Sequence, residues 1–285
     1  GSRCGAAMPR LDDTRRPPRA DEAAAIDLAR ASQARVYDLL LGGKNNFEVD
    51  RQFVQELLKI APEISELTRQ NRRWLADAIG RMSADGGIDQ FLDLGAGLPT
   101  ALNTHDIALR ADAAAKVVYV DNDLTAVSHG QALLADDRRS FFADADVADP
   151  AAVLSHPAVT EALDLTRPVG ILLGLVLHSI PDPAGVVADY LAAVPSGSYL
   201  ALTHPLNPRD GGRLAEFATA IEEKLRDAFP HIRFRTRDEI AELVTGLDLA
   251  GPGLVDLASW WPDGERTLNA SGTGRLVLVA LARKP

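Results

Sequence analysis

Two glycines and an acidic residue lie together in the segment DLGAGLPT, residues 93–100. Gly95 and Gly97 allow a sharp backbone turn that approaches a ligand closely, because no Cβ intervenes. Asp93 precedes the turn and suits a cationic group, such as the amino group of an amino-acid moiety, better than a pyrophosphate. A dinucleotide site would favour a third glycine where Thr100 stands. Such turns also occur for packing alone, so this segment by itself leaves both interpretations open.

A second acidic residue follows the next predicted strand. In VYVDND, residues 118–123, Asp121 falls where that strand ends. Ligands of open α/β sheets bind at the carboxyl ends of the strands. A carboxylate there can accept hydrogen bonds from both hydroxyls of a ribose, and Asn122 could assist at the ribose or at a base. The alternative is that Asp121 only caps the next helix, but Asp123 could do that instead, so we favour binding.

A third acidic segment, ADADVADP at residues 143–150, follows the next strand. We expect Asp146 to accept a hydrogen bond from the exocyclic amine of an adenine, with the backbone N–H of Val147 facing the ring, and we favour this pair over Asp144. Acidic residues before Pro150 are also ordinary turn and helix-cap residues, which is a strong alternative.

The fourth strand leads into LVLHSIPD, residues 175–182. This position is where a transferred group and its acceptor would meet. His178 could be a general base or a wall of the pocket. A single histidine at a strand end is more often structural, and His204, after the fifth strand, is a weaker candidate.

The segment YDLLLGGKNNF near the N-terminus gathers polar and aromatic side chains around two glycines. We expect it to close over a bound ligand, with Tyr37, Asn45 and Phe47 in contact and Gly42 and Gly43 as the flexible point. Tyr37 is also a candidate catalytic residue. The alternative is a helix C-cap followed by an N-cap, which explains the glycines but leaves Tyr37 without a role.

These segments occur in a chain that changes pattern near residue 88. Before it, hydrophobic spacing predicts only helices, over about 32–41, 47–60 and 64–82. After it come strands predicted at 91–95, 116–121, 140–146, 198–204, 254–260 and 275–283, and one that begins the apolar run 169–180. Helices predicted at about 99–110, 124–134, 150–163, 186–194 and 212–229 alternate with them. The last linker is too short for a crossover helix, so the final two strands should pair antiparallel. We therefore predict an α/β fold with a mostly parallel seven-stranded sheet and one antiparallel strand.

Composition narrows the function further. The chain has 285 residues, a formal net charge of −10 and a single cysteine, Cys4. The charge disfavours a nucleic-acid surface, and no apolar run is long enough to cross a membrane. One cysteine permits no internal disulfide, so we expect a cytoplasmic protein. The histidines show no metal-ligand spacing, and we expect no metal. We predict a disordered leader over 1–20, a helical segment over 21–87 that acts as a lid, and a Rossmann-like domain over 88–285 that binds the ligand.

Longer stretches resemble one known family, the actinobacterial S-adenosylmethionine-dependent methyltransferases long catalogued as a domain of unknown function, DUF574. The matching stretches are ARVYDLLLGGKNNFEVDR (34–51), NRRWL (71–75), QFLDLGAGLPTALNTHD (90–106), VVYVDND (117–123), DADVADP (144–150), LHSIPD (177–182), PSGSYLALTH (195–204) and GLDLAGPGLVDLASWWPD (246–263). Together they span nearly everything after residue 32. Two positions depart from the family pattern: Ala148 stands where arginine is usual, and WWPD at 260–263 stands where WRPD is usual.

The resemblance implies a class I methyltransferase fold and S-adenosylmethionine as the cofactor, with S-adenosylhomocysteine as the product. It implies that Asp93, Gly95 and Gly97 line the methionine part, that Asp121 holds the ribose and that Asp146 lies at the adenine. Leu98 and Leu175, which border these turns, complete the expected contacts.

The resemblance does not define the methyl acceptor. We expect a small molecule rather than nucleic acid, and the sequence predicts no oligomeric state. Two alternatives stay open at this point. A sensor or scaffold would bind the cofactor without turnover, and an NAD-dependent oxidoreductase would use the same fold, although Asp93 and Thr100 argue against it.

Overall fold

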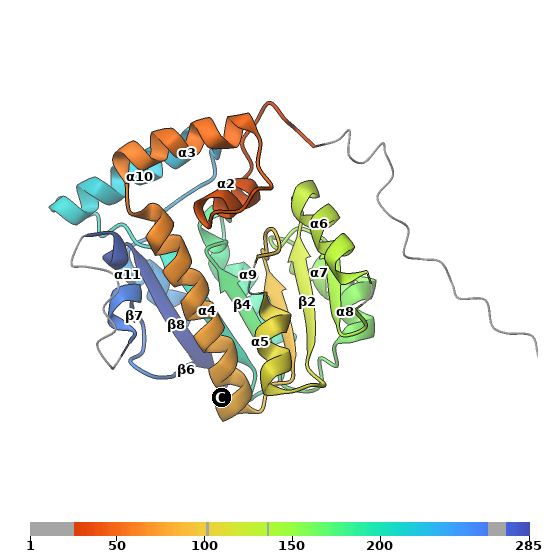
Figure 1. Ribbon diagram of the computed structural model, residues 1–285. Helices are drawn as coiled ribbons and strands as arrows, with labels where there is room; N and C mark the ends of the chain where they lie inside the picture. Colours follow the sequence, from red (N-terminus) through yellow and green to blue (C-terminus); the bar gives the residue numbers. More distant parts are fainter. Residues whose placement is uncertain (1–25, 101–102, 136, 262–271) are drawn as a thin grey trace, which may run out of the picture.

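The computed structural model describes residues 26–100, 103–135, 137–261 and 272–285, and the predicted leader over 1–20 lies outside them. One sheet carries helices on both of its faces (Figure 1). Its strands are β1 (Gln90–Leu94), β2 (Lys116–Asp121), β3 (Ser140–Asp144), β4 (Gly170–Gly174), β5 (Tyr199–Pro205), β6 (Asp248–Leu249), β7 (Val255–Asp256) and β8 (Val277–Arg283).

Three helices precede the sheet, as predicted: α2 (Gln33–Leu40), α3 (Glu48–Ile60) and α4 (Ile64–Gly86). The others are α5 (Thr104–Ala111), α6 (Leu124–Leu134), α7 (Pro150–Ser155), α8 (Pro157–Ala162), α9 (Pro183–Ala192), α10 (Arg213–Ala228) and α11 (Arg237–Glu242), with 3₁₀ turns η1 (Leu177–Ser179), η2 (Leu257–Ser259) and η3 (Gly272–Arg275). None of the described helices is long and apolar enough to span a membrane.

The strand order is β3-β2-β1-β4-β5-β8-β6, and β7 also pairs with β8. The pairs from β3 to β5 are parallel, whereas β8 runs antiparallel to β5, β6 and β7. This confirms the predicted fold class, a mostly parallel sheet with one reversed strand. The chain leaves β1 for β2 and β3 on one side and continues with β4 and β5 on the other. The carboxyl ends of β1 and β4 therefore flank the reversal of strand order, where such sheets bind ligands.

Successive residues of the central strands face opposite sides of the sheet, because a strand has a side-chain period of two. Leu92 and Leu94 of β1 belong to a core cluster with α7, α8, α9 and α11. Phe91 belongs to a second cluster that includes Trp74 of α4 and Ala108 of α5. Burial on both faces explains why these strands read as apolar runs in the sequence.

A third core cluster stands apart from the sheet. It joins α2, α3 and α10, with Val36, Leu57, Ile221, Phe229 and Ile232 among its buried residues. Figure 1 shows α2 above the ends of the central strands, with α3 crossing above α2 and α10 beside α3. The N-terminal helices thus cover the carboxyl edge of the sheet, which is the edge that carries the predicted site.

Two boundaries differ from the sequence-based expectation. The helix expected from Pro99 begins at Thr104, because Asn103 and Asp106 form a capping box there. The strand expected over 254–260 has only two residues, since the chain turns into η2 and buries Trp260 against α4. There the Trp260 ring lies 5.3 Å from that of Trp74, edge to face.

The structure contains three more elements than the sequence patterns predict. The helical stretch after Pro150 is divided into α7 and α8, because His156 is extended and precedes Pro157. Helix α11 and the two-residue strand β6 follow α10 without having been predicted. Six-residue helices and two-residue strands carry too little periodicity for a sequence pattern to reveal.

Candidate functional site

One cavity of about 1080 Å³ opens at the carboxyl ends of β1, β2 and β4 and extends beneath α2 to α10. Its volume lies at the upper end of the roughly 300–1,000 Å³ range of small-molecule sites, so it has room for two small ligands. The cavity brings together nine of the predicted site residues, namely Tyr37, Gly95, Gly97, Asp121, Asn122, Asp146, Val147, Leu175 and His178.

The turn after β1 requires its two glycines. Gly95 and Gly97 have φ values of 72° and 66°, a region that residues with a Cβ avoid. A Cβ on Gly95 would lie 2.5 Å from Val176 Cγ2, so the turn also packs tightly against the chain leaving β4. A Cβ on Gly97 would meet no atom within 4 Å. Gly97 therefore leaves open a space along the cavity wall that a ligand can fill.

Asp121 connects this turn to β2. One carboxylate oxygen accepts a hydrogen bond from the Gly97 backbone N–H at 2.7 Å, and the other accepts from that of Asp123 at 2.9 Å. Burial raises the pKa of Asp121, while these backbone donors lower it. Each oxygen of a carboxylate has a second lone pair, so Asp121 can still accept from two ligand hydroxyls.

Asp146 and Val147 border the cavity after β3. Asp146 is exposed, and its Oδ1 accepts from the Ala148 N–H at 2.9 Å. Val147 is buried, and its carbonyl accepts from the Tyr190 hydroxyl at 3.0 Å. The Val147 N–H donates to none of the described residues. The pair therefore offers a ligand a carboxylate and a fixed backbone donor side by side.

Leu175 lies where β4 ends, in an unusual backbone conformation. Its φ is 51°, one of two positive values among the described residues other than glycine. Its N–H donates to the backbone oxygen of Thr203 at 3.2 Å and to the Thr203 hydroxyl at 3.0 Å. Strained conformations held in this way are frequent at ligand sites. This conformation directs the chain past Gly95 and places both Leu175 and His178 in the cavity wall.

Arg72 is a cavity residue for which the sequence analysis assigned no role. It lies on α4 in the NRRWL stretch and lines the cavity next to Gly95, Ala96 and Gly97. Its Nη2 donates to Thr100 Oγ1 at 3.3 Å. Arg69, one turn earlier on α4, is exposed and pairs with the half-buried Glu66. The sequence does not distinguish these two arginines, because only the packing of α4 places Arg72 at the sheet edge.

Tyr37 also lines the cavity, at the end that contains Arg72. Its hydroxyl oxygen accepts from Asn71 Nδ2 at 2.9 Å, which leaves its own hydrogen able to donate. Burial raises the pKa of Tyr37, an effect that Arg72 partly opposes. The phenol therefore stays protonated at neutral pH and serves as a donor rather than a base.

Asp93 and Leu98 do not line the large cavity. The Asp93 carboxylate lies beneath the turn, buried, and accepts from Thr104 Oγ1 at 2.6 Å. Both residues border a separate cavity of about 20 Å³ with Arg72 and Gly97, which has room for about one water molecule. Asp93 therefore lies one layer deeper than the lining of the large cavity, and its direct contact with an amino group stays a prediction.

Asn45 and Phe47 lie outside the lining of the cavity, contrary to the expected arrangement. Asn45 is exposed, and its backbone N–H donates to Asp38 Oδ2 at 3.1 Å. Phe47 is the N-cap residue of α3, and its ring lies 5.0 Å from the Arg35 guanidinium. Phe47 thus caps the start of α3 and Asn45 bonds through its backbone, while the predicted contacts of both side chains with a ligand stay a prediction.

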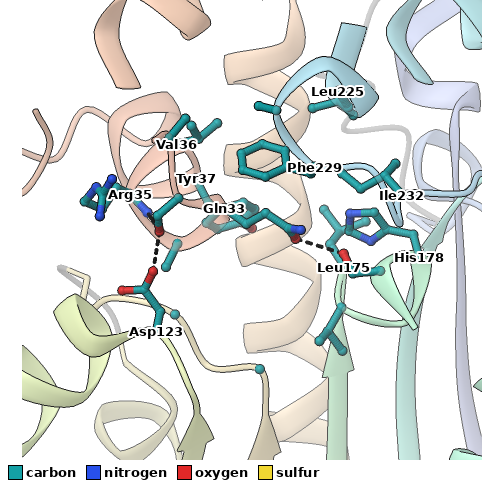
Figure 2. Close-up of a pocket in the computed structure, with 18 of the residues that line it drawn as sticks. Gln33, Arg35, Val36, Tyr37, Asp123, Leu175, His178, Leu225, Phe229 and Ile232 are labelled. Atoms are coloured by element: carbon teal, nitrogen blue, oxygen red, sulfur yellow. Dashed lines mark hydrogen bonds between the residues drawn. The ribbon is translucent and has the colours of Figure 1, made fainter. Parts of the chain in front are cut away.

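The N-terminal end of α2 is bonded to both sides of the cavity (Figure 2). The Ser32 hydroxyl donates to Asp123 Oδ2 beyond β2. On the other side, the Ser179 hydroxyl donates to Gln33 Oε1 at 2.9 Å. The segment that covers the site is therefore held by residues at 32 and 33 rather than by those near the glycines at 42 and 43.

His178 is buried in the opposite wall, and neither ring nitrogen bonds to a described residue. Behind it, the Arg235 guanidinium donates to the carbonyls of Leu177 and Ile180, at 3.0 and 2.9 Å, and to His204 Nε2 at 2.9 Å. Burial, aided by the charge of Arg235, lowers the pKa of His178 to about 4. Burial also lowers the pKa of His204, to about 3.

We expect both imidazoles to stay neutral well below the ordinary histidine range. In an NMR titration, the ring signals of His178 and His204 should not move between pH 8 and about pH 5, whereas the urea-unfolded chain should titrate near 6.5. The unfolded state then binds more protons between about pH 4 and 6.5, so these two groups make the folded state less stable as the pH falls through that window. A midpoint near 6.5 for either folded-state ring would contradict this.

Among the described residues, no group of three histidine, cysteine, aspartate or glutamate side chains is placed to hold a metal ion. The polar groups at the sheet edge are instead carboxylates, backbone donors and one arginine around an open cavity. That set suits an organic ligand with a diol, a base and an amino-acid group.

Comparison with known proteins agrees with this arrangement. The model of a family described as S-adenosyl methyltransferase matches residues 19–285. A protein of Thermobifida fusca, assigned as a methyltransferase, is 37% identical, with 91% of this chain and 97% of that chain covered and a TM-score of 0.84. A DUF574 family protein from Streptomyces avermitilis is 34% identical, with 91% of this chain and all of that chain covered and a TM-score of 0.84. The comparison with curated proteins finds no match.

Proposed function

This chain belongs to the S-adenosyl methyltransferase family and is an S-adenosylmethionine-dependent methyltransferase, and from that premise we propose how its cavity divides between cofactor and acceptor. Arg72 and the turn at Gly95 and Gly97 hold the amino-acid end of the cofactor. Asp121 holds the ribose, with Asn122 beside it. Asp146 and the Val147 N–H hold the adenine, and Leu175 borders the sulfonium.

The observation that carries this proposal is the continuity of the cavity. One continuous space passes three kinds of group. Arg72 lies beside the turn after β1, Asp121 lies at the end of β2, and Asp146 with the Val147 N–H follows β3. The open side of Gly97 and the N–H of Val147, which no described residue bonds, are features that an adenosyl amino acid would fill. Asp93 can act on the cofactor through the water-sized space that it shares with Arg72.

Bound S-adenosylmethionine supplies a methyl group that is already activated by a positively charged sulfur. The residues of this chain then need mainly to align an acceptor with that methyl and to exclude water. Tyr37, protonated and bonded to Asn71, acts as a donor toward the cofactor end. His178, neutral and in the opposite wall, faces the acceptor. Both roles concern alignment, and neither requires a side chain that is charged during turnover.

The first test asks which end of the cofactor Arg72 binds. We expect Arg72→Gln to weaken binding of S-adenosylhomocysteine by about tenfold, because a charge-assisted contact with its carboxylate is lost. Binding of 5′-methylthioadenosine, which lacks the amino-acid group, should stay within about twofold. Calorimetric titration of both ligands measures the difference.

The matched control for this test is the adjacent residue. Arg73 is exposed, lies outside the cavity lining, and has its guanidinium 4.9 Å from the ring of Trp261. Arg73→Gln should bind both ligands as the wild type does. If Arg72→Gln weakened both ligands equally, its assignment to the amino-acid end would be wrong.

The remaining space is proposed to take a small-molecule acceptor beside the cofactor. The expectation that residues 21–87 act as a lid stays a prediction; what supports it is that Ser32 and Gln33 bond to both sides of the cavity. The cytoplasm stays the expected compartment on the basis of the single cysteine.

A further inference from the structure

We propose, on the basis of the function above, that the methyl acceptor is an uncharged, largely apolar small molecule with a hydroxyl group. It is seated in the part of the cavity between α2 and α10, with the hydroxyl donating to the His178 ring. We call this part the acceptor compartment, and its walls are Val36, Leu40, Leu57, Leu225, Phe229 and Ile232.

The walls of the acceptor compartment come from the third core cluster. Figure 2 shows Leu225, Phe229 and Ile232 on one side of the space and Val36 on the other, with His178 below Ile232. Val36, Phe229 and Ile232 are all buried. These residues pack with one another in that buried cluster and also border the cavity, so this part of its wall is apolar. A cavity lined in this way favours an apolar occupant.

No charged side chain of the described cavity lining is left to pair with a charged acceptor in the acceptor compartment. Arg35 is neutralised by Asp50 at 2.7 Å, with both side chains buried. Asp123 accepts from Ser32, and Asp121 lies at the sheet edge with the cofactor. Arg72 and Asp146 are assigned to the two ends of the cofactor. Apart from His178, the other acidic and basic side chains of the lining, those of Asp27, Arg30 and His231, are exposed to solvent. A charged acceptor would lose its hydration without gaining a partner, which is a large cost.

The hydroxyl is inferred from the unpartnered ring of His178. This side chain is more than nine-tenths buried and lines the cavity, and its Nδ1 has no hydrogen-bond partner among the described residues. A neutral imidazole carries one nitrogen that only accepts, so it needs a donor from the ligand. The fixed charge of Arg235 behind it disfavours the imidazolium form. A neutral hydroxyl provides the donor, whereas an aliphatic amine would enter as a cation.

The transfer balances with this arrangement. A bond forms between the hydroxyl oxygen and the methyl carbon while the bond from that carbon to sulfur breaks, and its electron pair stays on sulfur. The hydroxyl proton is released to solvent and carries away the positive charge that the sulfonium brought, while the His178 ring accepts the hydrogen bond and stays neutral. No oxidant, reductant or metal is needed.

Three bicyclic probes test the class of acceptor on the full chain saturated with S-adenosylhomocysteine: 2-naphthol, 6-hydroxy-2-naphthoate and naphthalene. Saturation is verified first by calorimetry, so a failure of the cofactor site is recognised separately. We expect 2-naphthol to bind at least about tenfold more tightly than 6-hydroxy-2-naphthoate, because only the latter carries a charge into the compartment. Equal binding, tighter binding of the carboxylate, or no binding of 2-naphthol would overturn the proposal.

A charge introduced into the wall should largely remove this preference. Leu225 is half-buried on α10, so a lysine can be accommodated there, and Leu225→Met is the matched neutral control. In Leu225→Lys the preference for 2-naphthol over the carboxylate should fall about tenfold, while Leu225→Met keeps it. An unchanged preference in Leu225→Lys, with S-adenosylhomocysteine still bound, would show that the probes bind elsewhere.

Comparing 2-naphthol with naphthalene, which lacks the hydroxyl, tests the role of His178. Wild-type protein should prefer 2-naphthol to naphthalene by about tenfold, since one hydrogen bond in a dry site distinguishes them. His178→Leu should lose that preference and keep its affinity for naphthalene. His178→Gln, which retains an acceptor, should keep part of the preference. If His178→Leu discriminated as the wild type does, His178 would not be the partner of the hydroxyl.

Discussion

Replacing Asp121 by asparagine should weaken the binding of S-adenosylmethionine by about 10- to 100-fold. A hydrogen bond to a charged group contributes about 1.5–3 kcal/mol, and each 1.4 kcal/mol is a factor of ten in affinity. Asparagine keeps the shape but has only one acceptor oxygen. Both carboxylate oxygens already accept from backbone N–H groups, those of Gly97 and Asp123. The amide must therefore turn a donor toward one of them, and the ribose loses a charged acceptor.

The matched control for this variant is Asp144→Asn. Asp144 lies opposite Asp121 in the register of β2 and β3, is exposed, and does not line the cavity. The same change of charge on the neighbouring strand should leave affinity within about twofold of the wild type. Calorimetry with S-adenosylmethionine and with 5′-methylthioadenosine should show equal losses in Asp121→Asn, because both ligands carry the ribose. A loss confined to S-adenosylmethionine would move Asp121 away from the ribose.

Replacing Gly95 by alanine should cost stability and binding together. A left-handed backbone costs a residue with a Cβ roughly 1–2 kcal/mol, and overpacking adds roughly 1–3 kcal/mol. The new Cβ would lie 2.5 Å from Val176 Cγ2, where β4 leads toward His178. We expect the free energy of unfolding to fall by about 3 kcal/mol and the affinity for S-adenosylmethionine by at least about tenfold, as measured by denaturant titration and calorimetry.

Gly80 provides the control for this glycine. It lies within α4, has no positive φ, and a Cβ there would meet no atom within 4 Å. Gly80→Ala should therefore leave binding unchanged and stabilise the fold by about 0.5–1 kcal/mol, because alanine favours a helix. A Gly95→Ala variant as stable as the wild type would mean that the turn can relax around the added methyl group.

Sequence patterns predicted the positions of those site residues that lie next to a single strand. Gly95 directly follows β1, Asp121 is the last residue of β2 and Asp146 comes shortly after β3, so their strand positions determine where they lie at the sheet edge. Parallel strands bring their carboxyl ends to the same edge, and this geometry alone gathers these residues into one cavity. The alternation of buried strands with helices was sufficient to predict the fold class for the same reason.

The part that sequence patterns could not predict depends on contacts between distant elements. Phe229 and Ile232 form cavity walls only because α10 packs against α3, far along the chain. Arg72 faces the glycine turn because of the way α4 is rotated about its axis. Hydrophobic periodicity identifies the buried face of a helix but does not show which of its polar residues reaches a ligand. The segment around Asn45 was assigned to the ligand because it is rich in polar groups, but these groups serve the helix ends. Capping and binding use the same residue types.

The most direct test of the central claim is a crystal structure of the chain with S-adenosylhomocysteine. The ribose hydroxyls should lie within hydrogen-bonding distance of Asp121, about 2.7 Å, with the adenine at Asp146 and Val147 and the amino-acid carboxylate toward Arg72. The space lined by Leu225, Phe229 and Ile232 should remain open beside the sulfur. A ligand bound with its ribose away from Asp121, or with its amino-acid end filling the acceptor compartment, would contradict the account.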